Sequence, residues 1–391
     1  MRSLDEFATA KLDELQRASL RRTLVDTTRV TGIWTLRNGR RLLSFCCNDY
    51  LNLTHHPAVK EAAIEALRTY GVGAGASRFV TGNHPLFAEL EMRLARWKDT
   101  EAACVFGSGY LANLGIIPAL VGEGDLVLVD ELAHACLWGG ARLSRAEVIA
   151  FRHSDLRHVE ELLGAQRPRN KHALIATDGV FSMDGDIAPL KALGELAQQH
   201  DAWLMSDDAH GLGVLGDGHG STLVQGADVP LQMGTLSKAL GAYGGYLCAS
   251  TAVIGLIHNR ARSLIYETGL PPAMVGAAIA ALDLIAREPA YAALPVQKAQ
   301  AFARAAGLPQ PESPIVPIVI GEAADALAAS RLLEEHGFLV TAIRPPTVPP
   351  GTARLRLTFT AQHPDDQIAR LAALVRKRIL VRLAAHAISA Q

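Results

Sequence analysis

The sequence predicts an α/β protein in which a large domain holds a mostly parallel sheet with helices on both faces, followed by a smaller α+β domain. Two observations lead to this prediction. Short apolar runs alternate with helical patterns from about residue 57 to residue 285, and such alternation is typical of a parallel sheet covered by helices. After about residue 285 the alternation gives way to a different order of helices and strands.

The large domain is predicted over residues 51–285. The segment 56–71, HPAVKEAAIEALRTYG, predicts a helix that ends before Gly71. Between the helical segments lie short apolar runs bounded by turn residues, which suits buried strands. These runs are residues 101–109, 126–130, 147–151, 173–178, 202–208 and 244–250, and the helical run 188–200 is one of those between them.

Two flanking parts complete the predicted organisation. Residues 1–50 are predicted to form an N-terminal arm, with a charged amphipathic helix and a later turn at residues 37–39. Residues 286–391 are predicted to form the small C-terminal domain. Its predicted elements are, in order, a helix, a Pro-rich strand (313–320), a helix (324–337), a strand, a loop (344–351), a strand (353–359) and a final helix.

Composition excludes several classes of function. The net charge of the 391 residues is -1, so no electrostatic field favours nucleic acid. No run approaches the roughly 20 apolar residues that span a bilayer, and the acidic N-terminus lacks the apolar core of a signal peptide. The five cysteines have no zinc spacing, which indicates reduced thiols in a cytoplasmic protein without a metal site.

Lys238 is the first candidate for chemistry. It lies in the segment MGTLSKALGAYGG (233–245), among small and apolar neighbours rather than charged ones. An amine in such a place is less well solvated, so its neutral form, which attacks aldehydes, becomes more accessible. The alternative is a loop lysine whose stem only covers apolar surface.

Two acids and a histidine follow the apolar run 202–206 as Asp207, Asp208 and His210. Parallel sheets present ligands at the carboxyl ends of their strands. A carboxylate there could keep a pyridinium nitrogen protonated and so make a cofactor ring an electron sink. The alternative is an acid that caps a turn, and it applies to at least one of the two.

A glycine-rich turn begins a helix at Phe106-Gly-Ser-Gly109-Tyr110. Backbone N–H groups at a helix start bind phosphate, although a plain tight turn explains the pattern equally well. A dinucleotide-binding loop is the rival interpretation. The full GxGxxG pattern is absent, with Ala112 at the third position, but Asp130 lies near the distance where such loops place an acid.

Two further positions carry alternatives of their own. His134 follows the run 126–130 and could lie against a flat cofactor, or it could simply make a hydrogen bond at a helix start. Arg354 and Arg356 alternate on a predicted strand and share a face. A guanidinium in a dry site is a bidentate partner for a carboxylate, whereas an exposed strand face is the simpler explanation.

Taken together, these segments resemble the α-oxoamine synthase family of fold-type-I pyridoxal-phosphate enzymes, whose fold is like that of aspartate aminotransferase. The resemblance runs from about Leu20 to the final helix. It is carried by CNDYLNL (47–53), DELAHACL (130–137), TDGVFSMDGDIAPL (177–190), DDAHGLG (207–213), GTLSKALG (234–241) and RPPTVPPGTARLRLTFTAQH (344–363). The order and spacing of these motifs are far more specific than any one of them.

The resemblance implies a role for each matching residue. Lys238 would form the Schiff base with pyridoxal 5'-phosphate, Asp207 would pair with its pyridine nitrogen, and His134 would stack on its ring and assist proton transfer. The remaining cofactor contacts would come from Gly109, Tyr110, Ser182, His210 and Thr235. The amino-acid carboxylate would be held by Asn48 and Arg356, and the acyl substrate or product would be met by Arg21 and Thr347; His134 would also contact the substrate.

Within the family, YETGLPPAM (266–274) and residues 344–363 most resemble the biotin-pathway branch. That likeness implies condensation of L-alanine with a pimeloyl thioester, on acyl carrier protein or coenzyme A, in a cytoplasmic homodimer. A sibling synthase using glycine and another acyl-CoA, an aminotransferase-like activity and a nucleotide-binding or non-catalytic α/β protein remain as alternatives.

Overall fold

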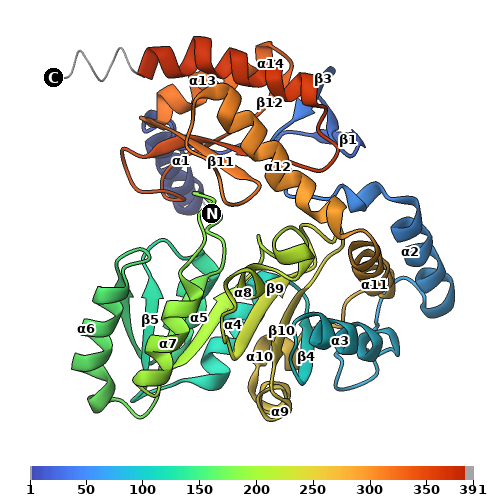
Figure 1. Ribbon diagram of the computed structural model, residues 1–391, viewed down its shortest axis with the longest axis vertical. Coiled ribbons are helices and arrows are strands. Elements are labelled where there is room, and N and C mark those ends of the chain that lie inside the picture. Colours follow the sequence, from blue (N-terminus) through green and yellow to red (C-terminus); the bar gives the residue numbers. More distant parts are fainter. Residues whose placement is uncertain (1, 384–391) are drawn as a thin grey trace. The chain divides into compact units, whose positions relative to one another are not determined.

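A computed structural model describes residues 2–383 and divides the chain into two compact units (Figure 1). The larger unit is Asn48–Pro295. The smaller unit combines the residues up to Cys47 with those from Val296 onward. The N-terminal segment therefore groups with the C-terminal part of the chain, which the sequence pattern does not indicate.

The larger unit is built around a seven-stranded sheet with the order β4-β10-β9-β8-β7-β5-β6. Only β10 is antiparallel to its neighbours, so the other six strands point the same way. The strands are β4 (Ala102–Phe106), β5 (Leu126–Asp130), β6 (Glu147–Phe151), β7 (Ala173–Asp178), β8 (Trp203–Asp207), β9 (Leu231–Thr235) and β10 (Gly245–Ala249).

Side chains that alternate along these strands enter two separate cores, one on each face of the sheet. Val127 and Val129 of β5 join a cluster with α4, α5 and α9, whereas Leu126 and Leu128 join a cluster with α6 and α7. The helices of this unit are α2 (Pro57–Tyr70), α3 (Leu86–Trp97), α4 (Gly109–Leu120), α5 (Ala135–Ser144), α6 (Leu156–Gln166), α7 (Leu190–Gln199), α8 (Ser221–Gln225), α9 (Thr251–Arg260), α10 (Arg262–Ile265) and α11 (Pro272–Arg287).

The smaller unit has two sheets, with the orders β1-β2-β3-β12 and β11-β14-β13. Its core contains Phe45, Phe338 and Phe359, whose rings meet edge to face. The helix α12 (Pro289–Ala306) contains the boundary between the units. The other elements are α1 (Arg2–Arg17), β1 (Thr27–Thr31), β2 (Trp34–Arg37), β3 (Arg40–Ser44), β11 (Ile315–Gly321), α13 (Ala323–Glu335), β12 (Phe338–Leu339), β13 (Thr341–Ile343), β14 (Ala353–Thr358) and α14 (Asp365–Val375).

The fold class is confirmed. The apolar runs at 126–130, 147–151 and 173–178 are β5, β6 and β7, and the other predicted strand runs contain β4, β8 and β10. Across residues 2–383, none of the helices combines the length with the apolar character that crossing a membrane requires.

Candidate active site

A cavity of about 240 Å³ lies in the larger unit, where strands of the same direction end. β4, β5, β7, β8 and β9 each supply lining residues at or just after their carboxyl ends, as expected for a parallel sheet. All eight residues that the sequence assigns to the cofactor line this cavity: Gly109, Tyr110, His134, Ser182, Asp207, His210, Thr235 and Lys238.

The start of α4 forms one end of the cavity. The Ser108 side chain caps this helix by accepting a hydrogen bond from the Leu111 N–H at 3.1 Å. Gly109 is the first helical residue, and a Cβ there would lie 3.2 Å from Met233 Cε, so the cavity wall has little room for a side chain. The first N–H groups of a helix have no intrahelical acceptor, and this end of α4 can hold a phosphate.

Asp207 ends β8 and is buried, but its carboxylate is well supplied with donors. Asn113 Nδ2 donates to Oδ2 at 2.7 Å, and the Ala209 N–H donates to Oδ1 at 3.0 Å. Asp178 lies opposite Asp207 on β7. Burial, with the negative charge of Asp207, raises the pKa of Asp178 well above its usual range. Beside Asp207, the carboxyl group of Asp178 is therefore favoured in its protonated form.

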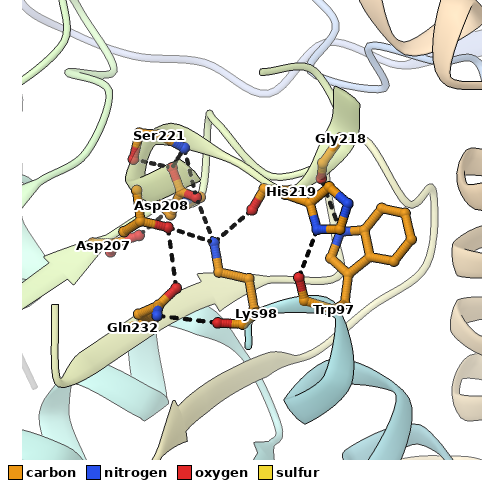
Figure 2. A network of polar contacts seen from close by, with 10 residues as sticks. Trp97, Lys98, Asp207, Asp208, Gly218, His219, Ser221 and Gln232 are labelled. Atoms are coloured by element: carbon orange, nitrogen blue, oxygen red, sulfur yellow. Dashed lines mark hydrogen bonds and ion pairs between the residues drawn. The ribbon is translucent and has the colours of Figure 1, made fainter. Parts of the chain in front are cut away.

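The next residue, Asp208, belongs to a buried network outside the cavity lining (Figure 2). Lys98 Nζ lies 3.1 Å from its Oδ2, and both side chains are almost fully buried, at 1% and 0% exposure. The Ser221 hydroxyl donates to Oδ1 at 2.6 Å. The structure thus separates the two adjacent acids: Asp207 lines the cavity, and Asp208 ties the following loop to Lys98.

Lys238 lies on the loop after β9, with its Nζ 2.8 Å from His210 Nε2. His210 Nδ1 in turn lies 2.6 Å from the Tyr50 hydroxyl. The loop is tightly folded: Gly241 has φ +65°, and a Cβ there would lie 2.4 Å from the Thr54 N atom. A glycine is therefore required for the turn that presents Lys238 to the cavity.

His134 caps the start of α5 and also lines the cavity. Its backbone N–H donates to Asp178 Oδ2 at 2.8 Å, and burial lowers the pKa of its imidazole.

Ser182 lies in the loop after β7, and the imidazole of His153 holds this loop in place. His153 Nδ1 lies 3.1 Å from Asp130 Oδ1, and its Nε2 lies 2.8 Å from Asp186 Oδ2. These two carboxylates raise the pKa of His153 to about 10.

Of the five predicted substrate residues, His134 lines this cavity and the other four lie outside its lining. Asn48 begins the larger unit, and its Oδ1 accepts a long 3.5 Å hydrogen bond from the Tyr50 hydroxyl. Arg21 and Thr347 line a separate cavity of about 570 Å³ in the smaller unit. Arg356 is buried on β14 rather than exposed on a strand face.

Four residues near the cofactor positions escape sequence reasoning. Asp178 had a usable signal, because it ends an apolar run just as Asp207 does. Cys136 lies two residues from His134 in a segment already singled out. Tyr50 lies in the motif 47–53 and Asn113 follows the glycine-rich turn, but neither segment indicates their partners, His210 and Asp207, which are 160 and 94 residues away along the chain.

The chemical groups of this cavity fit pyridoxal 5'-phosphate. Lys238 supplies an amine for its aldehyde, and Asp207 supplies a carboxylate for its pyridine nitrogen. The start of α4 offers N–H groups for its phosphate, and Ser182 and Thr235 add hydroxyls. The small space around Gly109, which a side chain would fill, suits the close approach of a ligand.

Comparison with known proteins agrees with this fit. Residues 40–375 match the family model described as aminotransferase class I and II. The 8-amino-7-oxononanoate synthase of Methylocella silvestris is 65% identical over 342 residues, covering 87% of this chain and 98% of the relative. That of Granulibacter bethesdensis is 60% identical over 376 residues, covering 96% and 98%.

A solved structure shares the fold of this chain at lower sequence identity. A serine palmitoyltransferase variant from S. paucimobilis, with a bound aldimine of pyridoxal phosphate and myriocin, has a TM-score of 0.89 and 28% identity, covering 96% of this chain and 97% of that one. The cofactor of this chain is pyridoxal phosphate. The chain therefore belongs to the aminotransferase class I and II family, and it is an acyltransferase of the 8-amino-7-oxononanoate synthase type.

Proposed function

We propose that this enzyme condenses L-alanine with a pimeloyl thioester, releasing CO2 and the free carrier thiol and forming 8-amino-7-oxononanoate for biotin biosynthesis. The observation that carries the proposal is the convergence of Lys238, His210, His134 and Asp207 on one cavity, in a chain whose relatives bear that enzyme's name. The carrier of the acyl group is acyl carrier protein or coenzyme A.

Lys238 is proposed to carry the cofactor and then to move protons at Cα of alanine. When bound, pyridoxal phosphate withdraws electrons from Cα and so acidifies its proton. Asp207, held by Asn113 and the Ala209 N–H, is placed to keep a pyridine nitrogen protonated. The Lys238 amine lies in the same cavity, so it can remove the Cα proton as general base and later return one.

The bonds made and broken balance around that carbon. Once its proton is lost, Cα attacks the thioester carbonyl carbon, a C–C bond forms, and the C–S bond breaks with release of the thiol. The carboxylate of the original alanine then leaves as CO2, and a proton takes its place on Cα. His134, whose neutral form is favoured by burial, is proposed to assist proton transfer at the ketone oxygen.

The substrate contacts are proposed from the family resemblance. Asn48 and Arg356 are assigned to the amino-acid carboxylate, and Arg21 and Thr347 to the acyl substrate or product. The burial of Arg356 supports its role, since a charged hydrogen bond from a buried guanidinium is worth roughly 1.5–3 kcal/mol. Arg21 and Thr347 both line the separate cavity of the smaller unit, which supports the proposal that they contact one ligand.

A sibling reaction is the second candidate. The structural similarity to serine palmitoyltransferase favours the general chemistry of decarboxylative condensation over any one pair of substrates. A sibling enzyme would join glycine to a different acyl-CoA with the same cofactor residues. One methyl group on Cα changes selectivity by only about 1–3 kcal/mol, so the acyl group is the sharper discriminator.

Product identification tests the proposed reaction. Mass spectrometry of the enzyme with L-alanine and a pimeloyl thioester is expected to show 8-amino-7-oxononanoate. The values of kcat/KM for alanine and for glycine are then measured with acetyl, succinyl, pimeloyl and palmitoyl thioesters. We expect alanine with the pimeloyl thioester to be preferred. A tenfold preference for glycine with acetyl or succinyl coenzyme A would instead assign the sibling reaction.

We also infer that the enzyme works as a homodimer. The support is the family resemblance together with large apolar side chains that the larger unit exposes, among them Val72, Val80 and Tyr266 at 77%, 74% and 72%. Apolar surface of this kind favours protein association. Light scattering of the active enzyme is expected to give twice the chain mass of 41.7 kDa; a fully active species at the monomer mass contradicts the inference.

A further inference from the structure

Cys136 and Asn113 form a bridge between His134 and Asp207. Cys136 Sγ lies 2.7 Å from His134 Nδ1. Asn113 Nδ2 lies 3.0 Å from that sulfur and 2.7 Å from Asp207 Oδ2. The Asn113 side chain is fully buried, and Cys136 is 2% exposed. Water therefore competes little for these contacts, which join the end of β8 to α4 and to the start of α5.

The direction of each hydrogen bond follows from the chemistry of the groups. An amide oxygen facing the Asp207 carboxylate would be repelled, so the Asn113 NH2 group must face it. This group has two protons, and the geometry gives one to Asp207 and the other to Cys136. The sulfur therefore accepts from Asn113, and its own S–H is left to donate.

The tautomer of His134 follows from a backbone group. The Cys136 N–H lies 3.3 Å from His134 Nδ1, and a backbone N–H can only donate. Nδ1 must therefore carry a lone pair, and the ring proton must lie on Nε2. Because this nitrogen then cannot donate, the 2.7 Å contact with Cys136 Sγ requires the S–H as donor. The other acceptor within reach of the sulfur, Asp207 Oδ2, is much farther away, at 3.9 Å. Burial raises the pKa of this thiol, so its proton stays in place at neutral pH.

We propose that Cys136 and Asn113 are positioning residues that hold His134 neutral, with its proton on Nε2, and couple its orientation to Asp207. The proposal deepens the proposed function, because His134 is the residue assigned to proton transfer at the ketone. A neutral ring with one fixed donor can give a proton at a defined point, whereas a ring free to change tautomer cannot.

The groups around His134 act on its pKa in both directions, with burial as the largest effect. Asp207 on β8 favours a protonated ring, and Asp178 on β7 accepts the backbone N–H of His134. Lys238 and burial favour the neutral ring. Removal of the S–H donor takes away a contact that only the neutral ring can accept. The pKa of His134 should therefore rise when the thiol is lost.

The test compares Cys136→Ala with Cys136→Ser, whose hydroxyl has the same donor and acceptor roles. Histidine labelled with 15N reports the protonation of His134 directly, in both cofactor-free and cofactor-loaded protein, and His134→Gln identifies its signals. The alanine variant is expected to titrate about 0.5–1 pH unit higher than wild type. The midpoint of the His134 titration in the serine variant is expected to stay close to that of wild type. In each variant, the midpoint of the acidic limb of the kcat–pH profile should shift by the same amount as the titration midpoint.

Cys104→Ala is the matched control, because it removes another buried thiol, on β4, that does not line the cavity. It should leave the titration of His134 unchanged. An unchanged titration in Cys136→Ala, or a serine variant that behaves like alanine, would overturn the proposal. The titration is measured without substrate. Its outcome is therefore independent of whether 8-amino-7-oxononanoate is identified as the product.

Discussion

Replacing Lys238 with alanine is expected to lower kcat/KM by about 10⁴-fold or more, since the variant loses both the covalent attachment of the cofactor and the base that moves the Cα proton. Borohydride reduction followed by peptide mapping provides the second measurement. In wild type the cofactor should be fixed to the peptide containing Lys238, and in the variant no peptide should carry it. Turnover near the wild-type level would contradict the assignment.

Two further variants sharpen this test. Lys238→Arg keeps a positive charge near His210, whose Nε2 lies 2.8 Å from the present amine, but a guanidinium remains protonated and cannot act as a neutral nucleophile. It should be as inactive as the alanine variant. Lys191→Ala removes an exposed lysine of α7 and should leave both activity and cofactor fixation unchanged.

The second large effect is expected on stability, from the buried pair of Lys98 and Asp208 (Figure 2). Lys98→Met leaves the Asp208 carboxylate without its cation, although the Ser221 contacts remain. Removal of one partner of a buried ion pair costs about 3–5 kcal/mol. Urea unfolding should show a loss of this size, together with weaker cofactor binding, because His210 lies on the loop that begins at Asp208.

Lys298→Met is the matched control. Lys298 also pairs with an aspartate, at 2.9 Å from Asp365, but that carboxylate is 89% exposed. The expected loss is therefore only about 0–1 kcal/mol. Combining Lys98→Met with Asp208→Asn should recover part of the stability, since no buried charge is then left unpaired. If Lys98→Met cost no more than the control, the network would not secure this loop.

Much of the fold was predictable because the signals are local, whereas the cofactor set was predicted from local signals at a few positions together with the family resemblance. Apolar runs of the right length identify β5, β6 and β7 without reference to the rest of the chain. Glycines and polar residues directly after such runs identify the cavity-lining positions, since parallel strands bring their carboxyl ends together. The substrate residues rest on resemblance alone, and of the five only His134 lies in the lining of the cofactor cavity.

Contacts over long chain distances were not predictable in this way. The pairing of β3 with β12 joins Leu43 to Phe338 and groups the N-terminal residues with the C-terminal part of the chain. Asn113 shows the same limit at the candidate site: nothing in the sequence of α4 marks it as the donor to Asp207. Such pairings depend on how the elements pack, which short motifs do not encode.

The sequence by itself determined the alternation of strands and helices in the larger unit and marked Lys238 as a candidate, and the family resemblance supplied most of the predicted residues around it. The residues alone left open which of the two adjacent acids at the end of β8 serves the site; the family resemblance favoured Asp207, and the tertiary structure separates the two. Successive residues leaving a strand point in opposite directions, so only one of Asp207 and Asp208 can reach the cavity. Which one does so depends on the packing of the sheet: Asp207 lines the cavity, while Asp208 turns away from it to pair with Lys98.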